Sequence, residues 1–178
     1  MRPAVEGPVR TTRQLVVGVS DLAVSNDPDL VLATFALGSC VGITAWDPLA
    51  RVGALLHCLL PESSLAPEKA VQKPAMFCDS GIPRMLAQLE SLGAERRRLR
   101  VCLAGAARVL EGADYFDIGR RNLLAAKRLL WQHGLMVHAE DSGGNLSRSL
   151  KLCLADGAVT VKTPGLERPL STPTAFRS

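Results

Sequence analysis

The sequence has few aromatic residues and no long apolar run, and each shortage excludes a class of protein. Aromatic residues make up only 4% of the 178 residues, and a nucleic-acid site would need aromatic rings to stack on bases. No run of about 18 apolar residues occurs, so we expect no membrane insertion. The first residues lack the apolar segment of a secretory signal, so we expect a cytoplasmic protein.

Disulfide and metal chemistry are not indicated either. The five cysteines are odd in number and form no C-x-x-C pair, which argues against a disulfide framework and a zinc finger. His133 and His138 have no spaced carboxylates or cysteines beside them, so no metal is expected. The segment Ser142–Ser149 lacks the Gly-Lys-Ser/Thr ending of a P-loop and predicts a tight turn in a pocket wall. We therefore expect no cofactor.

The composition indicates one globular domain. Hydrophobic residues make up 47% of the chain, and the net charge is +4, values typical of a folded protein. We expect a single domain over residues 14–163, a disordered tail over 1–13 and a loose tail over 164–178. The densest basic run, Glu95–Arg100, indicates a solvated helix end, or alternatively a surface that attracts an acidic protein partner.

The pattern of apolar residues predicts seven or eight strands and two main helices. One helix carries the stripe Ile82, Met85, Leu86, Leu89 and Leu92, with Asp79 or Ser80 as N-cap and Gly93 at its end. A second runs from Ile118 to His133, with Asp117 as N-cap. Strands are predicted at Gln14–Val19, Leu30–Phe35, Val41–Trp46, Val52–Leu60, Leu99–Leu103, Leu135–Ala139, Leu150–Leu154 and Ala158–Lys162. This mixture favours an α/β (α+β) fold in which layered mixed sheets are flanked by helices.

The stretch Thr34–Pro61 holds the strongest chemical signal. Cys40 directly follows Gly38-Ser39, and His57 lies 17 residues further on (57 − 40 = 17). Two strands joined by a turn at Asp47-Pro48 separate them, so a cysteine on one strand can face a histidine on its neighbour. Such a pair supplies a thiol nucleophile and an imidazole base.

A purely structural interpretation stays open, in which Cys40 is a small core residue and His57 is a core histidine whose hydrogen bonds are all made. Two features weaken it. Gly38 and Ser39 can leave backbone N–H groups free to form an oxyanion hole, and His57 interrupts an apolar strand where its burial requires a polar partner. Thr34, on the preceding strand, can orient the histidine, although most threonines in strands have only a structural role.

Several motifs, in order and at matching spacing, resemble the chemoreceptor glutamine deamidase (CheD) family over roughly residues 15–162. They are Leu37–Cys40, Asp47-Pro48, Gly53-Ala54, His57-x-x-Leu60-Pro61, Lys73-Pro74, Phe77-x-Asp79, Ile118-Gly119-x-Arg121-Asn122 and Glu140–Asn145 with Arg148-Ser149. The resemblance implies a cysteine-dependent protein-glutamine glutaminase with Cys40 as nucleophile, His57 as base and acid, and Thr34 orienting the histidine. It also implies a fold like that of bacterial toxin deamidases. A protonated His57 is expected to lower the pKa of Cys40.

The resemblance implies partners as well. The substrates would be glutamine side chains on the cytoplasmic helices of chemoreceptors, and a CheC-type phosphatase would be a second partner. The same chemistry would also hydrolyse a glutamyl methyl ester. One alternative is a binding module that regulates such a phosphatase without catalysis, and a weaker one is a hydrolase of small amides. The chain departs from the family pattern at Gly105-Ala106-Ala107 and at Phe77. The effect of these differences on recognition of the substrate or the phosphatase stays open.

Overall fold

Two mixed five-stranded sheets form most of the computed structural model, which describes residues 12–108 and 117–172. We call them sheet A, with the order β1-β3-β8-β9-β10, and sheet B, with the order β2-β5-β4-β6-β7. The pairs β1–β3 and β6–β7 are parallel and the others antiparallel. The strands are β1 (Arg13–Val16), β2 (Asp21–Ser25), β3 (Leu30–Leu37), β4 (Val41–Asp47), β5 (Val52–Cys58), β6 (Arg100–Gly105), β7 (Val137–Ser142), β8 (Arg148–Cys153), β9 (Val159–Thr163) and β10 (Leu166–Ser171).

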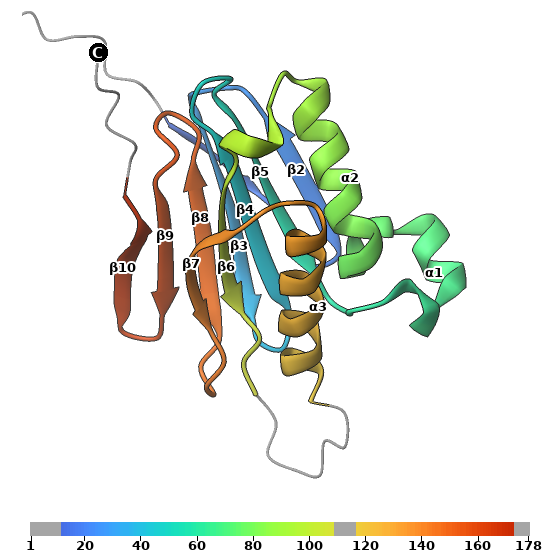
Figure 1. The fold of residues 1–178 in the computed structure, drawn as a ribbon. Helices are drawn as coiled ribbons and strands as arrows, with labels where there is room; N and C mark the ends of the chain where they lie inside the picture. Colours follow the sequence, from blue (N-terminus) through green and yellow to red (C-terminus); the bar gives the residue numbers. More distant parts are fainter. Residues whose placement is uncertain (1–11, 109–116, 173–178) are drawn as a thin grey trace, which may run out of the picture.

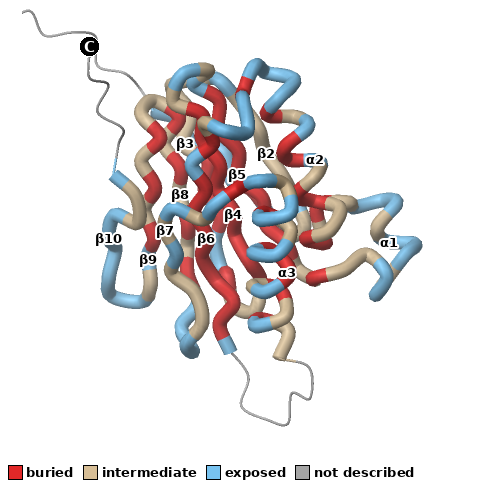
Figure 2. Tube along the Cα trace, in the orientation of Figure 1, coloured by how far each residue is buried: buried red, intermediate tan, exposed pale blue. Residues whose placement is uncertain are grey.

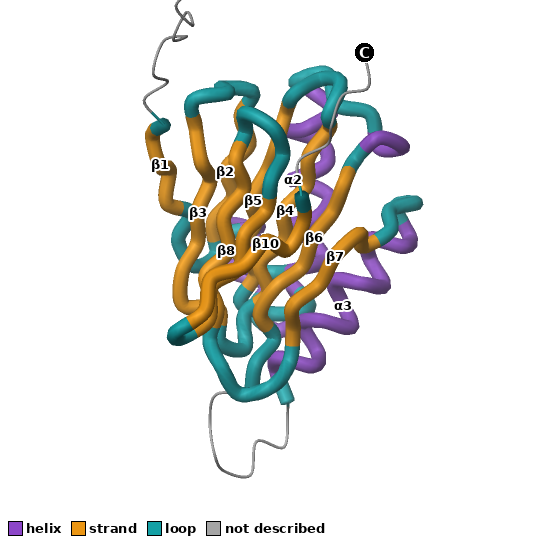
Figure 3. Tube along the Cα trace, turned by 90° about the vertical axis from the view of Figure 1, so that its left-hand side faces the viewer, coloured by secondary structure: helices purple, strands orange, loops and turns teal. Residues whose placement is uncertain are grey.

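Helices cover the face of sheet B that points away from sheet A. The two long helices, α2 and α3, lie side by side on this face, so the molecule has three layers (Figures 1 and 3). No helix in the described ranges is long and apolar enough to cross a bilayer. The helices are α1 (Pro67–Gln72), α2 (Cys78–Ser91) and α3 (Ile118–Gln132), with 3₁₀ turns η1 (Ser63–Leu65), η2 (Pro74–Met76) and η3 (Arg96–Arg98).

Two apolar cores separate the three layers. The core between the sheets includes Leu32, Leu55 and Leu152. The core between sheet B and the helices includes Leu56, Ile82 and Leu130. Strands β4 and β5 are buried at every residue because both of their faces are covered, and they form the buried centre in Figure 2. Any polar side chain on them therefore needs a partner inside the protein.

The structure confirms the mixed α/β class and most predicted elements. The two strands of the Thr34–Pro61 stretch are β4 and β5, and they pair antiparallel across a turn in which Asp47 Oδ1 accepts from the N–H of Leu49. Asp117 caps α3, because its side chain accepts from Arg120 N at 3.2 Å. Gly93 follows α2 with φ +92°, a left-handed conformation that favours glycine at a helix end. Strands β8 and β9 form the predicted hairpin.

Four expectations about the elements are wrong. The strand count was too low, since β2 was not predicted. The tail from Pro164 was expected to be loose, but part of it forms β10, which pairs with β9. Neither Asp79 nor Ser80 caps α2. Phe77 is the N-cap, and Asp79 instead accepts hydrogen bonds from Ser63. The 1–13 tail falls mostly outside the described residues, but Arg13 already belongs to β1.

Candidate active site

Thr34 and His57 form a hydrogen-bonded pair that joins the two sheets. Thr34 lies on β3 of sheet A, where alternation with Leu32 turns its side chain toward sheet B. His57 lies on β5 of sheet B, and both side chains are fully buried. The distance from Thr34 Oγ1 to His57 Nδ1 is 2.7 Å, and Thr34 Oγ1 also lies 2.7 Å from the carbonyl oxygen of Val17.

These two contacts determine which nitrogen of His57 carries the proton. A threonine hydroxyl has one hydrogen, and the carbonyl of Val17 can only accept. The hydroxyl therefore donates to Val17 and accepts from Nδ1–H of His57. Nε2 then carries the free lone pair, and it is buried without a hydrogen-bond partner among the described residues. An imidazole held in this tautomer is ready to accept a proton at Nε2.

Cys40 lies on the same side of sheet B as this imidazole. His57 pairs with Gly42 across the β4–β5 ladder, so both face the inter-sheet core, and Cys40 stands two residues before Gly42 in the same core. That placement makes Cys40 a diagonal neighbour of His57, at a typical Cα spacing of about 7–8 Å that a long side chain can span. Cys40 is 7% exposed, so the surrounding protein nearly encloses it.

The turn that carries Cys40 is fixed by the loop after β6. The carbonyl of Cys40 accepts from Ala106 N, and the carbonyl of Gly38 accepts from Ala107 N, both at 2.7 Å. Gly105 has φ +111°, and a Cβ at this position would lie 2.2 Å from the oxygen of Cys40. Gly105 therefore lets the two backbones approach closely.

Burial shifts the pKa of both reacting groups. Desolvation lowers the pKa of His57 from 6.5 to about 4. Desolvation also raises the pKa of the Cys40 thiol above 9.0, opposed by a hydrogen bond from its own backbone N–H. Burial thus favours the neutral form of both side chains. The expectation that a protonated His57 lowers the thiol pKa is wrong for this state, because too little water surrounds either charge.

Alkylation of Cys40 tests this protonation state. We expect its rate of reaction with iodoacetamide, followed by peptide mass spectrometry, to rise with pH through a midpoint above that of an unperturbed thiol, because burial raises the pKa of Cys40. The urea-unfolded chain is the control and should give a midpoint near the unperturbed value of about 8.5. A midpoint at or below about pH 7 in the folded protein would instead show a resting thiolate–imidazolium pair.

The other sequence candidates lie apart from this pair or serve structural roles. His138 Nδ1 accepts from the backbone of Val101. The Ser142–Ser149 segment is a turn held by the buried Arg148, which donates to the carbonyls of Gly143 and Leu146. Its Gly143 N–H donates to Gly105, so the turn does lie against the loop beside Cys40. Among the described residues, no cluster of metal-ligating side chains occurs.

The basic run lies at the opposite end of β4 from Cys40. Arg98 pairs with the buried Asp47 at the end of this strand, 2.8 Å away, about 20 Å from Cys40 at the usual rise of a strand. Arg96 pairs with Glu90 and Arg97 with Glu95. These carboxylates offset much of the positive charge, which weakens the expectation that this run attracts an acidic partner.

Comparison with known proteins identifies the family. A model described as CheD chemotactic sensory transduction matches residues 59–163. A protein of Solibacter usitatus called probable chemoreceptor glutamine deamidase CheD is 41% identical over 157 residues, 88% of this chain and 93% of that one. The chain belongs to the CheD family. The matched range of the family model begins after His57, so it does not include Thr34, Cys40 or His57.

Other relatives agree with this membership. Probable chemoreceptor glutamine deamidase CheD 2 of Anaeromyxobacter dehalogenans is 44% identical, and the match covers 88% of this chain and 98% of the relative. A solved structure, Neisseria meningitidis protein NMB0706 of the DUF152 family, matches 73% of this chain and 63% of its own with 11% identity and a TM-score of 0.44. A likeness at that level carries no argument about this CheD family member.

Proposed function

We propose that this protein is a cytoplasmic cysteine-dependent deamidase that converts glutamine side chains of chemoreceptors to glutamate. Membership of the CheD family and the names of its relatives, probable chemoreceptor glutamine deamidases, support the substrate class. The observation that carries the chemistry is the buried His57, whose Nδ1 is bound by Thr34 and whose Nε2 is left to accept a proton. Cys40 is the nucleophile that fits this base.

The proposed reaction has two halves, acylation and hydrolysis. The Cys40 sulfur attacks the carboxamide carbon as its proton passes to Nε2 of His57. Backbone N–H groups of Ser39 and Cys40 stabilise the oxyanion, and each such donor typically lowers the barrier by about 3–4 kcal/mol. The N–H of Gly38 is not free for this role, because it donates to the carbonyl of Ala36 at 2.9 Å. The protonated His57 then gives its proton to the departing ammonia, which leaves a glutamyl thioester.

Hydrolysis of the thioester regenerates the enzyme. His57 removes a proton from a water molecule as the water attacks the thioester carbon, and the thiol leaves with that proton. The product is a glutamate carboxylate, so a neutral side chain on the receptor helix acquires a negative charge. Because both reacting groups start neutral, proton transfer to His57 accompanies nucleophilic attack in each half of the cycle, by sulfur in the first and by water in the second.

Incubation with a purified receptor cytoplasmic fragment tests the function. Ammonia release and a gain of about 1 Da per site, the mass difference between carboxamide and carboxylate, should appear together in intact-mass spectra. A fragment already carrying glutamate at the modified sites is the control and should gain no mass. The absence of release from every matched receptor would leave binding to a partner as the main role. Preferred release of methanol from methylated fragments would favour the esterase reaction.

Thr34 is proposed as a positioning residue for His57. Thr34→Val removes the hydroxyl that receives Nδ1–H, and we expect kcat to fall about 10- to 100-fold, the equivalent of about 1–3 kcal/mol for one buried hydrogen bond. Thr34→Ser keeps the hydroxyl and should stay within about threefold of the wild-type rate. Steady-state ammonia release checks both variants. An unchanged kcat in Thr34→Val would contradict the role of Thr34.

Two expectations from the family resemblance remain proposals. One is binding to a CheC-type phosphatase, and the other is a fold like that of toxin deamidases. The Gly105-Ala106-Ala107 loop bears on the first, since it contacts the Cys40 turn directly. A pull-down with purified CheC-type phosphatase, compared between wild type and Cys40→Ala, separates docking from catalysis.

A further inference from the structure

A buried asparagine on α3 reaches the turn that carries Cys40. Asn122 is fully buried on a helix face whose other buried members are small or apolar. A carboxamide in such a place is unfavourable unless its polar atoms find partners. The two hydrogens on Nδ2 do so: one is donated to the carbonyl of Ser39 at 2.9 Å and one to the carbonyl of Leu59 at 3.0 Å.

These two carbonyls lie just past the end of the β4–β5 ladder. The last ladder pair is Val41 with Cys58, so Ser39 and Leu59 stand where strand pairing has stopped. Asn122 bonds to both and thereby continues the connection between the two strands. One of these strands ends shortly after His57, and the other begins directly after Cys40. The side chain thus sets the spacing between the segments that carry the nucleophile and the base.

Asn122 also fixes the direction of a backbone N–H in the site. Three successive carbonyls of the turn are bound: those of Gly38 and Cys40 by backbone N–H groups, and that of Ser39 by the Asn122 side chain. A trans peptide is planar, with its C=O and N–H pointing in opposite directions. Binding the Ser39 oxygen toward α3 therefore turns the Cys40 N–H away from α3, and this N–H is one of the proposed oxyanion donors.

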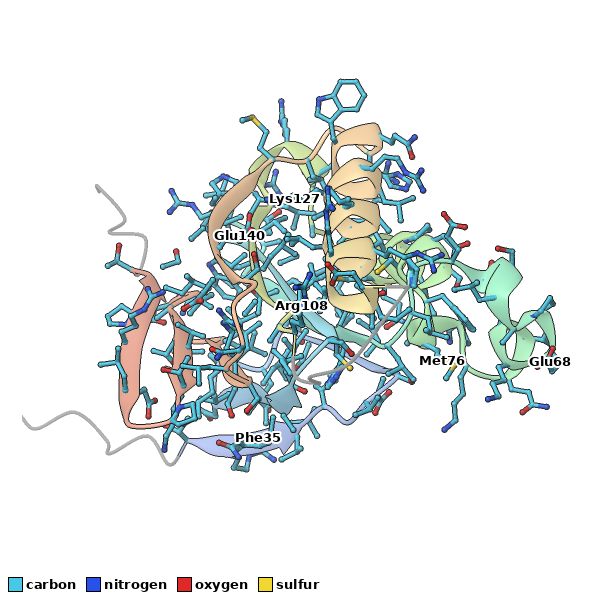
Figure 4. All side chains as sticks on the ribbon, turned by 90° about the horizontal axis from the view of Figure 1, so that it is seen from below. Phe35, Glu68, Met76, Arg108, Lys127 and Glu140 are labelled. Carbon is cyan, nitrogen blue, oxygen red and sulfur yellow. The ribbon has the colours of Figure 1, made fainter. Side chains whose placement is uncertain are left out.

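Helix α3 is held firmly enough to act as a fixed support. A Cβ on Gly119 would lie 2.9 Å from the backbone of Ala106, so the first turn of α3 packs directly on the loop that holds Cys40. Further along, Lys127 Nζ lies 2.6 Å from Glu140 Oε2 on β7, a pair labelled in Figure 4. Asn122 lies between these two anchor points.

We propose that Asn122 is a positioning residue that aims the Cys40 N–H and holds the nucleophile-bearing turn against the strand of His57. This role rests on the proposed deamidase function, because the N–H it aims is an oxyanion donor in that reaction. The sequence contains a signal for this role, since Asn122 is a polar residue on the apolar face of a predicted helix.

Asn122→Leu, which has a similar size and no donor, tests the proposal. We expect kcat for deamidation to fall about 10- to 100-fold, part of the about 10²–10³-fold that one oxyanion donor contributes, with KM within about threefold of wild type. The matched control is Leu130→Ala. It lies on the same buried face of α3, about 12 Å away along the helix axis, and should keep kcat within about threefold despite an equal or larger loss of melting temperature.

Hydrogen exchange gives a readout that needs no substrate. Peptides covering residues 38–41 should exchange at least about tenfold faster in Asn122→Leu, since the turn that carries their N–H groups loses its support from α3 and opens more often, and at the wild-type rate in Leu130→Ala. Unchanged exchange, equal loss of kcat in both variants, or a change in KM alone would overturn the proposal. If wild type deamidates no receptor, the proposed function fails and hydrogen exchange still decides the role of Asn122. Asn122→Ser, which keeps one donor, replaces Asn122→Leu if that variant does not fold.

Discussion

Cys40→Ala is expected to lower the rate of receptor deamidation by at least about 10⁴-fold, to the background rate. The substitution removes the only atom that can form the thioester, while the oxyanion donors and His57 stay in place. Because Cys40 is small, alanine leaves little empty space, and the melting temperature should change little. Ammonia release and intact-mass measurement with the receptor fragment check the rate.

Cys102→Ala is the matched control for this loss. Cys102 belongs to the same inter-sheet core and is 1% exposed, so its replacement has a similar packing cost at a position away from the Thr34–His57 pair. The control should retain a rate within about twofold of wild type, as expected for a substitution whose only effect is on packing. Release that persists in Cys40→Ala would reject Cys40 as the nucleophile, and equal loss in both variants would indicate a folding defect.

His57→Gln is expected to have the second-largest effect. Glutamine can still hydrogen-bond to Thr34, but it cannot accept a proton at neutral pH, so kcat should fall about 10²–10⁴-fold, the usual contribution of a general acid–base. The same measurement across pH should show wild-type kcat/KM without an acidic limb near 6.5, since the pKa of His57 lies at about 4. An acidic limb near 6.5 in wild type would contradict the depressed pKa.

The depressed pKa also predicts a pH dependence of stability. Between pH 6.5 and about 4 the unfolded chain binds a proton that folded His57 does not, so this contribution to the free energy of unfolding is complete above 6.5 and decreases as pH falls toward 4. The difference between a pKa of 6.5 in the unfolded chain and about 4 in the folded protein corresponds to about 3 kcal/mol. His57→Gln should lack this decrease and His133→Gln should keep it, as measured by urea unfolding at pH 7 and 4.5. An equal decrease in the free energy of unfolding of wild type and His57→Gln between pH 7 and 4.5 would contradict the depressed pKa of His57.

The sequence was informative where local patterns decide the structure. Strands β4 and β5 are continuous apolar runs joined by a turn that starts at Asp47, and such a hairpin can pair in only a few ways. That pairing places Cys40 diagonally across from His57, two residues before its ladder partner Gly42. Asp117 and Gly93 were equally local signals, since capping depends on the residues at the helix end itself.

Long-range features were beyond the sequence. Strand β10 is mostly exposed and contains Pro169, so it lacks the alternation that marks a strand. The contact between Asn122 and Ser39 joins residues 83 positions apart. The pKa directions depend on how completely sheet A covers sheet B, which no local pattern records. Only the assembled layers show that burial raises the pKa of Cys40 and lowers the pKa of His57.

The proposed base and the residue proposed to orient it belong to different sheets, so their alignment depends on how the two sheets pack. Thr34 and His57 meet at 2.7 Å across an inter-sheet core that includes Leu55 and Leu152. We expect a change of side-chain volume in this core to move one sheet relative to the other. Such a substitution would then lower both turnover and stability, even though it touches neither member of the pair.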